Sequence, residues 1–549
     1  MAAKKDFLFL WIAVAFLSGA ACAEGDGRPE VKVGAGRLVG VSEGGLNIYK
    51  GVPYAAPPTG ARRWKPPAAA ASWNGVRDAS AFGPSCIQPK PRPDSLYADD
   101  PAAMSEDCLT LNVWAPADAS DVAVVVWIHG GSLQYGGAAE PVYDGANVAQ
   151  RGVVFVSINY RLGVIGWLAH PDLSAESPDH ASGNYGLLDQ IAALQWVREN
   201  IAAFGGDPDN VTIMGESAGA LSVSYLLTSP LARGLFHKAI AQSANIRAVP
   251  ELKRSVYGLP AAESIGAALA ASAGNPDIEA LRAMDAQALT LASVKARFTP
   301  QGTIDGYALA KQVVDAFDAG EQARVALLAG FNSGEIRSQR VFVPPPPDSA
   351  AAYESQIVNR YGDLAPAFLR LYPSSDIAES MLATVRDAIY GWASERMVRD
   401  QSAAGLPAYL YLFDHCYEAA RKLGLCAFHA SDVPYVFGQI DPGATLPPNW
   451  PRPEGDGEQA LSAVMMDYWT NFAKTGEPSS PNGPAWNPYS ADEAYMRFSG
   501  EAIAETDLLS GMFEMQEELV GRRRRAGMQW FFNVGVTAPA MGAAAEEVN

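Results

Sequence analysis

Histidine and cysteine are scarce in this sequence. Six histidines and five cysteines are spread over 549 residues, with no Cys-x-x-Cys pair and no His-Glu-x-x-His run. Structural and catalytic metal sites are built from closely spaced residues of these types. The sequence therefore predicts no metal site.

Basic residues are also under-represented. Lysine and arginine number 41 against 60 aspartate and glutamate residues, which gives a formal net charge of −19. Such a chain repels polyanions, so the composition counts against a nucleic-acid partner. Glycine (51) and proline (39) are too few for a low-complexity chain, and the hydrophobic share of 48% suffices for a large core.

Long apolar runs are missing except near the N-terminus. Lys4 and Lys5 precede an apolar stretch from Phe7 to Leu17, and small residues follow as far as Ala23. The stretch is shorter than the ~20 residues that a membrane helix needs, and its flanks are typical of a secretory signal. We predict that residues 1–23 are a cleaved signal peptide, with an uncleaved anchor and a lipoprotein signal as the alternatives. The mature chain is then secreted or periplasmic, without stable membrane insertion.

Four cysteines remain after such a cleavage. An exported protein meets an oxidising compartment, which favours disulfides over free thiols. Of the three possible pairings, Cys86–Cys108 with Cys416–Cys426 closes the shortest loops, and loop-closure entropy gives roughly 3 kcal/mol for each.

Apolar, β-branched runs alternate with helical patterns along the chain. Residues 187–204 carry apolar side chains at spacings of three and four, which predicts a helix, and 250–300 and 345–400 are predicted as helical insertions. The predicted strands are 122–129, 153–160, 211–215, 325–331 and 408–413. This alternation predicts an α/β fold with a mostly parallel sheet. We expect one domain over 24–536 and a disordered tail over 537–549.

A Gly-x-Ser-x-Gly motif stands at 215–219, between a predicted strand and a segment that can form a helix. A tight strand-to-helix turn exposes a serine, here Ser217, at a helix N-terminus, and the flanking glycines avoid steric clashes. Upstream, the glycine-rich run His129-Gly130-Gly131-Ser132 ends a strand and can offer backbone N–H groups to an oxyanion. Together the two motifs point to a serine hydrolase.

Such a serine needs a base and an acid, which follow it in the order acid, then histidine. Three histidines follow Ser217. His237 is predicted within a helix, so the residues alone leave His415 and His429 as candidate bases. Among several carboxylates, Glu335 is the best placed acid, because it follows a predicted strand closely.

Seven blocks of sequence resemble the type-B carboxylesterase family, which includes cholinesterases and bacterial p-nitrobenzyl esterases. The likeness extends from about residue 31 to 531. The blocks are Tyr49–Pro58, Glu106–Pro116, Trp127–Gly131, Asn184–Gln190, Phe204–Gly219, Gly330–Glu335 and His429–Gly438. The resemblance implies an α/β-hydrolase fold with helical insertions on the sheet, and a small-molecule ester as substrate.

The resemblance also implies roles for individual residues. It makes Ser217 the nucleophile, His429 the base and Glu335 the acid, and it places the oxyanion donors at Gly131, Ser132 and Ala218. It matches Cys86–Cys108 to the family's first disulfide loop, whereas Cys416–Cys426 rests on proximity alone. Two residues depart from the family's pattern. Ser132 replaces its usual glycine or alanine, and Ile336 replaces the glycine that often follows the acid. Ester hydrolysis through this machinery requires no cofactor.

Three alternatives share the fold: a lipase, a specialised detoxifying esterase for a large ester, and a non-catalytic adhesion module. For the second, Arg337 and Arg340 are candidates to receive an anionic acyl group. The sequence does not indicate the oligomeric state.

Overall fold

The computed structural model describes residues 1, 27–97, 100–101, 103–274 and 277–541. The predicted signal peptide, residues 1–23, falls outside these ranges except for Met1. Within the described part of the chain, every helix is too short or too polar to span a bilayer.

A mixed sheet of eleven strands runs through the molecule in the order β16-β15-β14-β13-β12-β11-β9-β10-β8-β4-β3. The pairs from β10 through β9 and β11 to β15 are parallel, and the pairs at both ends of the sheet are antiparallel. The prediction of a mostly parallel sheet is confirmed. Its strands are β3 (Val41–Glu43), β4 (Leu46–Pro53), β8 (Thr110–Pro116), β9 (Val122–Ile128), β10 (Val154–Ile158), β11 (Gly206–Glu216), β12 (Lys238–Gln242), β13 (Ala326–Asn332), β14 (Ala408–Phe413), β15 (Ala494–Phe498) and β16 (Ala502–Thr506).

The core forms two layers, one on each face of this sheet. Successive side chains of a strand point to opposite faces: in β9, Val124, Val126 and Ile128 join one cluster while Val125 and Trp127 join the other. Both faces are covered, so the central strands are apolar throughout, as their sequence predicted. The first face is covered by α4 (Tyr185–Asn200), α5 (Ala218–Thr228) and α13 (Trp392–Ala403), and the second by α15 (Val433–Val436) and α16 (Asp456–Thr475).

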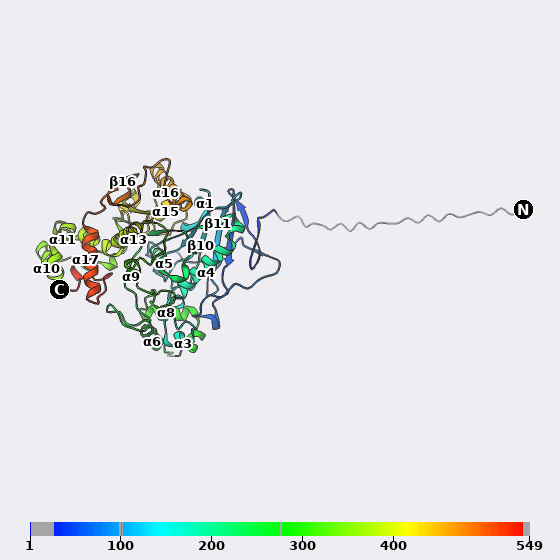
Figure 1. The fold of residues 1–549 in the computed structure, drawn as a ribbon, viewed down its shortest axis with the longest axis horizontal. Coiled ribbons are helices and arrows are strands. Elements are labelled where there is room, and N and C mark those ends of the chain that lie inside the picture. Colours follow the sequence, from blue (N-terminus) through cyan, green and yellow to red (C-terminus); the bar gives the residue numbers. More distant parts are fainter. Residues whose placement is uncertain (2–26, 98–99, 102, 275–276, 542–549) are drawn as a thin grey trace.

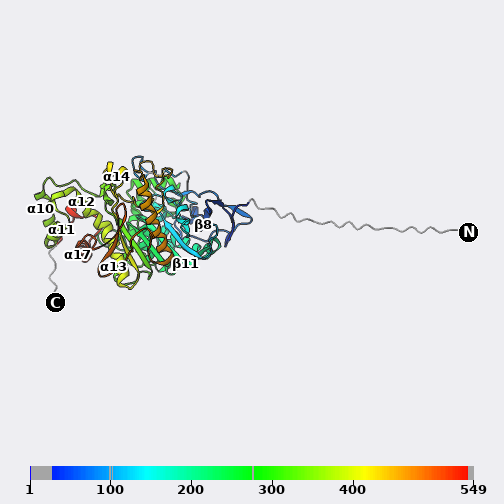
Figure 2. The ribbon, with the colours of Figure 1, turned by 90° about the horizontal axis from the view of Figure 1, so that it is seen from above.

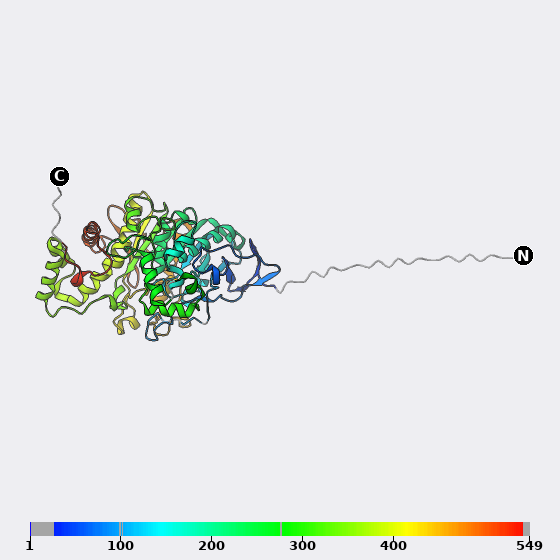
Figure 3. The same ribbon diagram turned by 90° about the horizontal axis from the view of Figure 1, so that it is seen from below.

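The predicted helical insertions lie outside the sheet. One contains α6 (Ala262–Ser272), α7 (Ile278–Ala283) and α8 (Ala286–Lys295), and the other α10 (Ala350–Tyr361), α11 (Ala365–Leu371) and α12 (Ile377–Arg386). The second insertion packs with α17 (Met512–Arg525) at one end of the molecule (Figure 1). The views in Figures 2 and 3 place the N-terminal strands at the opposite end.

The remaining elements are short. Two small sheets contain β1 (Glu30–Val33), β2 (Gly36–Val39) and β5 (Val76–Asp78), and β6 (Ser85–Cys86) with β7 (Met104–Ser105). The short helices are α1 (Ala146–Ala149), α2 (Gly163–Trp167), α3 (Pro171–Glu176), α9 (Val313–Asp318) and α14 (Glu418–Lys422).

Two predictions are wrong. The helix predicted around His237 is strand β12, which is buried along its whole length between β11 and β13. The disorder predicted for 537–549 is wrong for 537–541, because Ala538 is buried and its carbonyl accepts a hydrogen bond from Arg360. Residues 542–549 lie outside the described ranges.

Candidate active site

The turn between β11 and α5 places Ser217 alone between a strand and a helix. Its φ of +55° is unusual for a residue other than glycine. A Cβ at Gly219 would overlap the Ile128 carbonyl oxygen at the end of β9, and one at Gly215 would come within 2.5 Å of Gly219. The predicted strand–turn–helix arrangement is confirmed, and both flanking glycines are sterically required.

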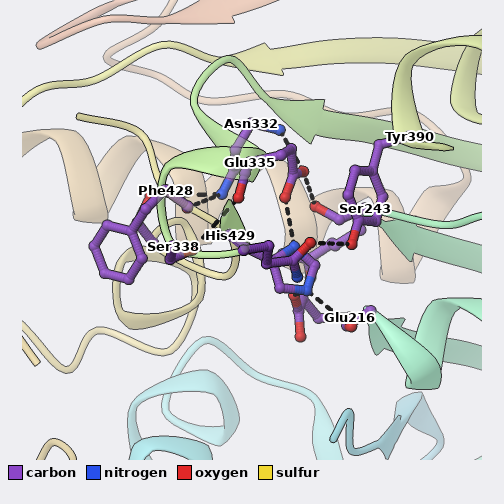
Figure 4. A network of polar contacts seen from close by, with 12 residues as sticks. Glu216, Ser243, Asn332, Glu335, Ser338, Tyr390, Phe428 and His429 are labelled. Carbon is purple, nitrogen blue, oxygen red and sulfur yellow. Dashed lines mark hydrogen bonds and ion pairs between the residues drawn. The ribbon is translucent and has the colours of Figure 1, made fainter. Parts of the chain in front are cut away.

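Three of the predicted site residues are hydrogen-bonded in series. His429 Nε2 lies 2.8 Å from Ser217 Oγ, and His429 Nδ1 is hydrogen-bonded to Glu335 Oε2. Both the imidazole and the carboxylate are buried, and Figure 4 shows them facing each other. His415 instead faces Glu458, whose Oε2 lies 2.7 Å from His415 Nε2.

Glu335 is held by two residues that the sequence analysis missed. Its Oε1 accepts hydrogen bonds from Ser243 Oγ at 2.6 Å and from the Asn332 backbone N–H at 2.9 Å. Ser243 directly follows β12 and Asn332 ends β13, so both stand at the carboxyl ends of strands (Figure 4). Their position at strand ends could have indicated both residues from the sequence. For Ser243 it did not, because β12 was predicted as part of a helix.

A second buried carboxylate, that of Asp432, is linked through Asn332 to the series Ser217–His429–Glu335. It accepts hydrogen bonds from Gln242 Nε2 at 2.7 Å, Asn332 Nδ2 at 3.0 Å and Tyr411 OH at 3.1 Å. Burial raises its pKa, while the bonds from Gln242 and Asn332 oppose the rise. Asp432 thus braces the turn that follows His429, and no motif in the sequence analysis indicated it.

Glu216 adds a further carboxylate beside the predicted base. It is buried, and its Oε1 lies 3.2 Å from His429 Nε2. Burial raises the pKa of Glu216 to about 8. Burial alone would lower the pKa of His429, but the negative charges of Glu216 and Glu335 outweigh it and raise that pKa to about 9. The site is thus built to stabilise a positive imidazolium.

The turn after β9 lies against Ser217 from the other side. A Cβ at Gly130 would lie 3.4 Å from Ser217 Cβ, and Gly131 (φ +97°) and Ser132 (φ +59°) continue the turn. Among the described residues, no acceptor is paired with the N–H of Gly131 or Ser132. Ala218 opens α5, so its N–H has no acceptor within the helix. These three predicted donors therefore flank Ser217 without internal partners.

A cavity of about 350 Å³ opens above these groups. Its wall combines aromatic side chains (Tyr97, Tyr135, Tyr143 and Trp450) with Ser217, His429, Glu216 and the turn at 130–132. Arg337 instead forms an ion pair with Glu379, 2.9 Å away. This pairing argues against a role for Arg337 in binding an anionic acyl group.

The four cysteines form the two predicted disulfides, Cys86–Cys108 and Cys416–Cys426. Across the described residues, no group of three or more histidine, cysteine, aspartate or glutamate side chains is arranged to hold a metal ion.

The carboxylesterase family model matches residues 27–513. The chain belongs to the carboxylesterase family. As a member it is a carboxylic ester hydrolase of the serine carboxylesterase type, with the α/β-hydrolase fold.

Named carboxylesterases resemble the chain over most of its length. It is 37% identical to a fumonisin B1 esterase of Sphingopyxis macrogoltabida over 85% of this chain and 86% of the relative. It is 36% identical to the para-nitrobenzyl esterase of Bacillus subtilis over 82% of this chain and 91% of that relative. Among solved structures, a PNB esterase superposes with a TM-score of 0.76 at 33% identity, covering 89% of this chain and 99% of that one.

Proposed function

We propose that Ser217, His429 and Glu335 form the catalytic triad of this carboxylesterase. The observation that carries the proposal is the continuous series from Ser217 Oγ through both ring nitrogens of His429 to Glu335. A serine hydroxyl is a weak nucleophile until a neighbouring base removes its proton, and the third group orients that base.

The reaction takes place in two halves. His429 Nε2 accepts the Ser217 proton as Oγ attacks the ester carbonyl carbon, and the N–H groups of Gly131, Ser132 and Ala218 bind the resulting oxyanion. The imidazolium then protonates the departing alcohol, leaving an acyl group on Ser217. Water attacks this acyl-enzyme with His429 again as base, which releases the acid and restores the serine. Removing one oxyanion donor costs ~3 kcal/mol in other enzymes.

A detoxifying esterase for a bulky ester is the second candidate. The 37% identity to a fumonisin B1 esterase favours it. The aromatic wall of the cavity suits a substrate with a large apolar portion.

The proposed location is the periplasm or the medium, after removal of residues 1–23. Two disulfides support it, because such bonds persist in oxidising compartments. N-terminal sequencing of the mature protein, together with cell fractionation, tests it. An intact Met1, or a protein confined to the cytoplasm, would contradict the location.

The catalytic proposal is tested with p-nitrophenyl acetate, butyrate, octanoate and palmitate. We expect Ser217→Ala to abolish turnover of every ester that the native protein hydrolyses. Ser224→Ala is the matched control, because it removes a buried hydroxyl from α5, the helix that follows Ser217, where this hydroxyl donates to the Ala220 carbonyl. Turnover close to the native rate in Ser217→Ala would contradict the triad, whereas a preference for palmitate would move the function to a lipase.

A further inference from the structure

The segment closed by the Cys86–Cys108 disulfide contacts both halves of the proposed catalytic machinery. Gln88 lies just inside the disulfide and reaches the turn that carries the oxyanion donors. Tyr97, nine residues further on, reaches His429. Neither residue belongs to the triad or the oxyanion hole.

Gln88 forms a two-way pair with the backbone of one residue, Gly136. Its Oε1 accepts a hydrogen bond from the Gly136 N–H at 2.9 Å, and its Nε2 donates to the Gly136 carbonyl at 2.8 Å. Gln88 is 2% exposed, and Gly136 is partly buried. A buried amide that satisfies both ends on one residue leaves that residue little freedom.

Gly136 in turn fixes the position of the oxyanion turn. A Cβ there would lie 2.5 Å from His129 Nδ1 and 2.9 Å from the Gly130 carbonyl, so its backbone packs directly on the residues before Gly131. Tyr135, the residue before it, donates its N–H to the Gly131 carbonyl at 2.8 Å. A shift of Gly136 therefore moves the turn whose N–H groups face the substrate.

Tyr97 holds the base through its hydroxyl group. This group donates to the His429 backbone carbonyl at 3.0 Å and lies 2.8 Å from Ser338 Oγ. Ser338 directly follows the short helix Glu335–Arg337, so one hydroxyl links the base to the turn that carries the acid. The Tyr97 ring meets the His429 ring edge-on, with centroids 6.3 Å apart.

Two residues beside the cavity, Asn449 and Trp450, anchor this part of the segment. Asn449 Nδ2 donates to the carbonyls of Pro93 and Ser95 at 2.7 and 2.8 Å, and Trp450 packs against Tyr97 with ring centroids 5.8 Å apart. Residues 86–97 are therefore held by the disulfide, by the Gln88 pair and by Asn449. The backbone that carries Tyr97 to His429 is thus anchored on its N-terminal side.

We propose that Gln88 and Tyr97 are positioning residues, through which the Cys86–Cys108 segment sets the oxyanion turn and the base independently. The inference rests on the proposed triad. It predicts two separable defects. Loss of the Gln88 pair weakens stabilisation of the oxyanion, and loss of the Tyr97 hydroxyl displaces His429 from Glu335.

The test compares Gln88→Met and Tyr97→Phe with two matched controls. Gln312 makes the same two-way pair with Val249, at 3.0 and 2.8 Å, and Tyr353 OH donates to the Tyr372 carbonyl at 3.0 Å. Gln312→Met and Tyr353→Phe therefore remove hydrogen bonds of the same type away from the cavity. Titration of Ser217 with a fluorophosphonate counts the folded sites, and kcat is expressed per site.

We expect Gln88→Met to lower kcat about tenfold or more, with KM and the acid limb of the kcat/KM–pH profile unchanged. Tyr97→Phe is expected to lower kcat by a similar factor and to move that limb to lower pH, because His429 loses part of its contact with the Glu335 charge. The controls keep native kcat and pH profiles. If Gln88→Met yields no folded sites, Gln88→Ala takes its place.

Native kcat and pH profiles in both test variants, or equal losses in the controls, would overturn the positioning roles. Failure of the triad itself gives a different result, since Ser217→Ala would then retain turnover and the fluorophosphonate would not label Ser217.

Discussion

Four ionisable side chains meet in the buried site: Glu216, Glu335, His429 and Asp432. Burying a charge is costly unless it is paired, and three carboxylates around one imidazole favour its protonated form. This arrangement suits the tetrahedral intermediate, in which the imidazole carries the serine proton. It also means that the resting base gains a proton readily as pH falls.

Glu216→Gln should therefore shift the pH dependence of catalysis. In the proposed mechanism the neutral form of His429 is the active base, so kcat/KM is expected to fall as pH drops through its pKa, which is raised to about 9. Removing the Glu216 carboxylate withdraws one of the charges that raise this pKa. The acid limb should then move to lower pH, measured as kcat/KM on p-nitrophenyl butyrate over about pH 4 to 10.

Glu140→Gln is the control for that profile, because Glu140 lines the same cavity but accepts its hydrogen bond from the Gly137 N–H. If the acid limb of the kcat/KM–pH profile stays in place for Glu216→Gln, or moves to higher pH, Glu216 does not stabilise the imidazolium.

At the scale of elements, the site is assembled from the ends of neighbouring strands. Ser217, Ser243 and Glu335 follow β11, β12 and β13, which are adjacent in the sheet, whereas His429 lies in a turn well beyond β14, after α14. Neighbouring strands lie about 4.8 Å apart. The sheet thus sets the spacing of the polar groups along its edge.

Tight packing at the elbow between β11 and α5 predicts the effect of Gly219→Ala. The added Cβ would meet the Ile128 carbonyl oxygen of β9, a backbone atom that cannot move without distorting the sheet. We expect a large loss of folded protein and of activity. Gly457→Ala in α16 is the control, since its Cβ would meet no atom within 4 Å and alanine favours a helix. Native activity of Gly219→Ala would contradict the steric argument.

The sequence predicted the elements whose patterns are local. Five strands, the helix at α4 and both helical insertions are confirmed, because long apolar or periodic runs identify them. Strand β12 was missed because Lys238–Gln242 is short and its pattern also suits a helix. At the site, the motifs located Ser217 and the turn at 130–132, and only the family resemblance separated His429 from His415.

The contacts that hold these groups were beyond prediction from the sequence. Ser243 is 92 residues from Glu335, and Gln88 is 48 residues from Gly136. Such pairs depend on the order of strands and on the course of the Cys86–Cys108 segment. Neither is encoded in local periodicity.

The net charge of −19 acts on the whole molecule. A net negative charge attracts cationic substrates and repels anionic ones, and salt screens both effects. For p-nitrophenyl esters that differ only in a distal trimethylammonium or carboxylate group, added NaCl should lower kcat/KM for the cation and raise it for the anion. The uncharged analogue is the control. An equal response of all three esters would exclude electrostatic steering.

The anchoring of the site to strand ends also governs how the enzyme fails on heating. While the strands stay paired, the spacing of Ser217 and Glu335 persists, so inactivation should coincide with the melting of the sheet, which circular dichroism follows. The Cys86–Cys108 segment is covalently closed but lies outside that sheet. Under a thiol reductant, activity should therefore vanish at a lower temperature than the circular dichroism signal. An inactive but still folded enzyme should then accumulate at temperatures below the melting of the sheet.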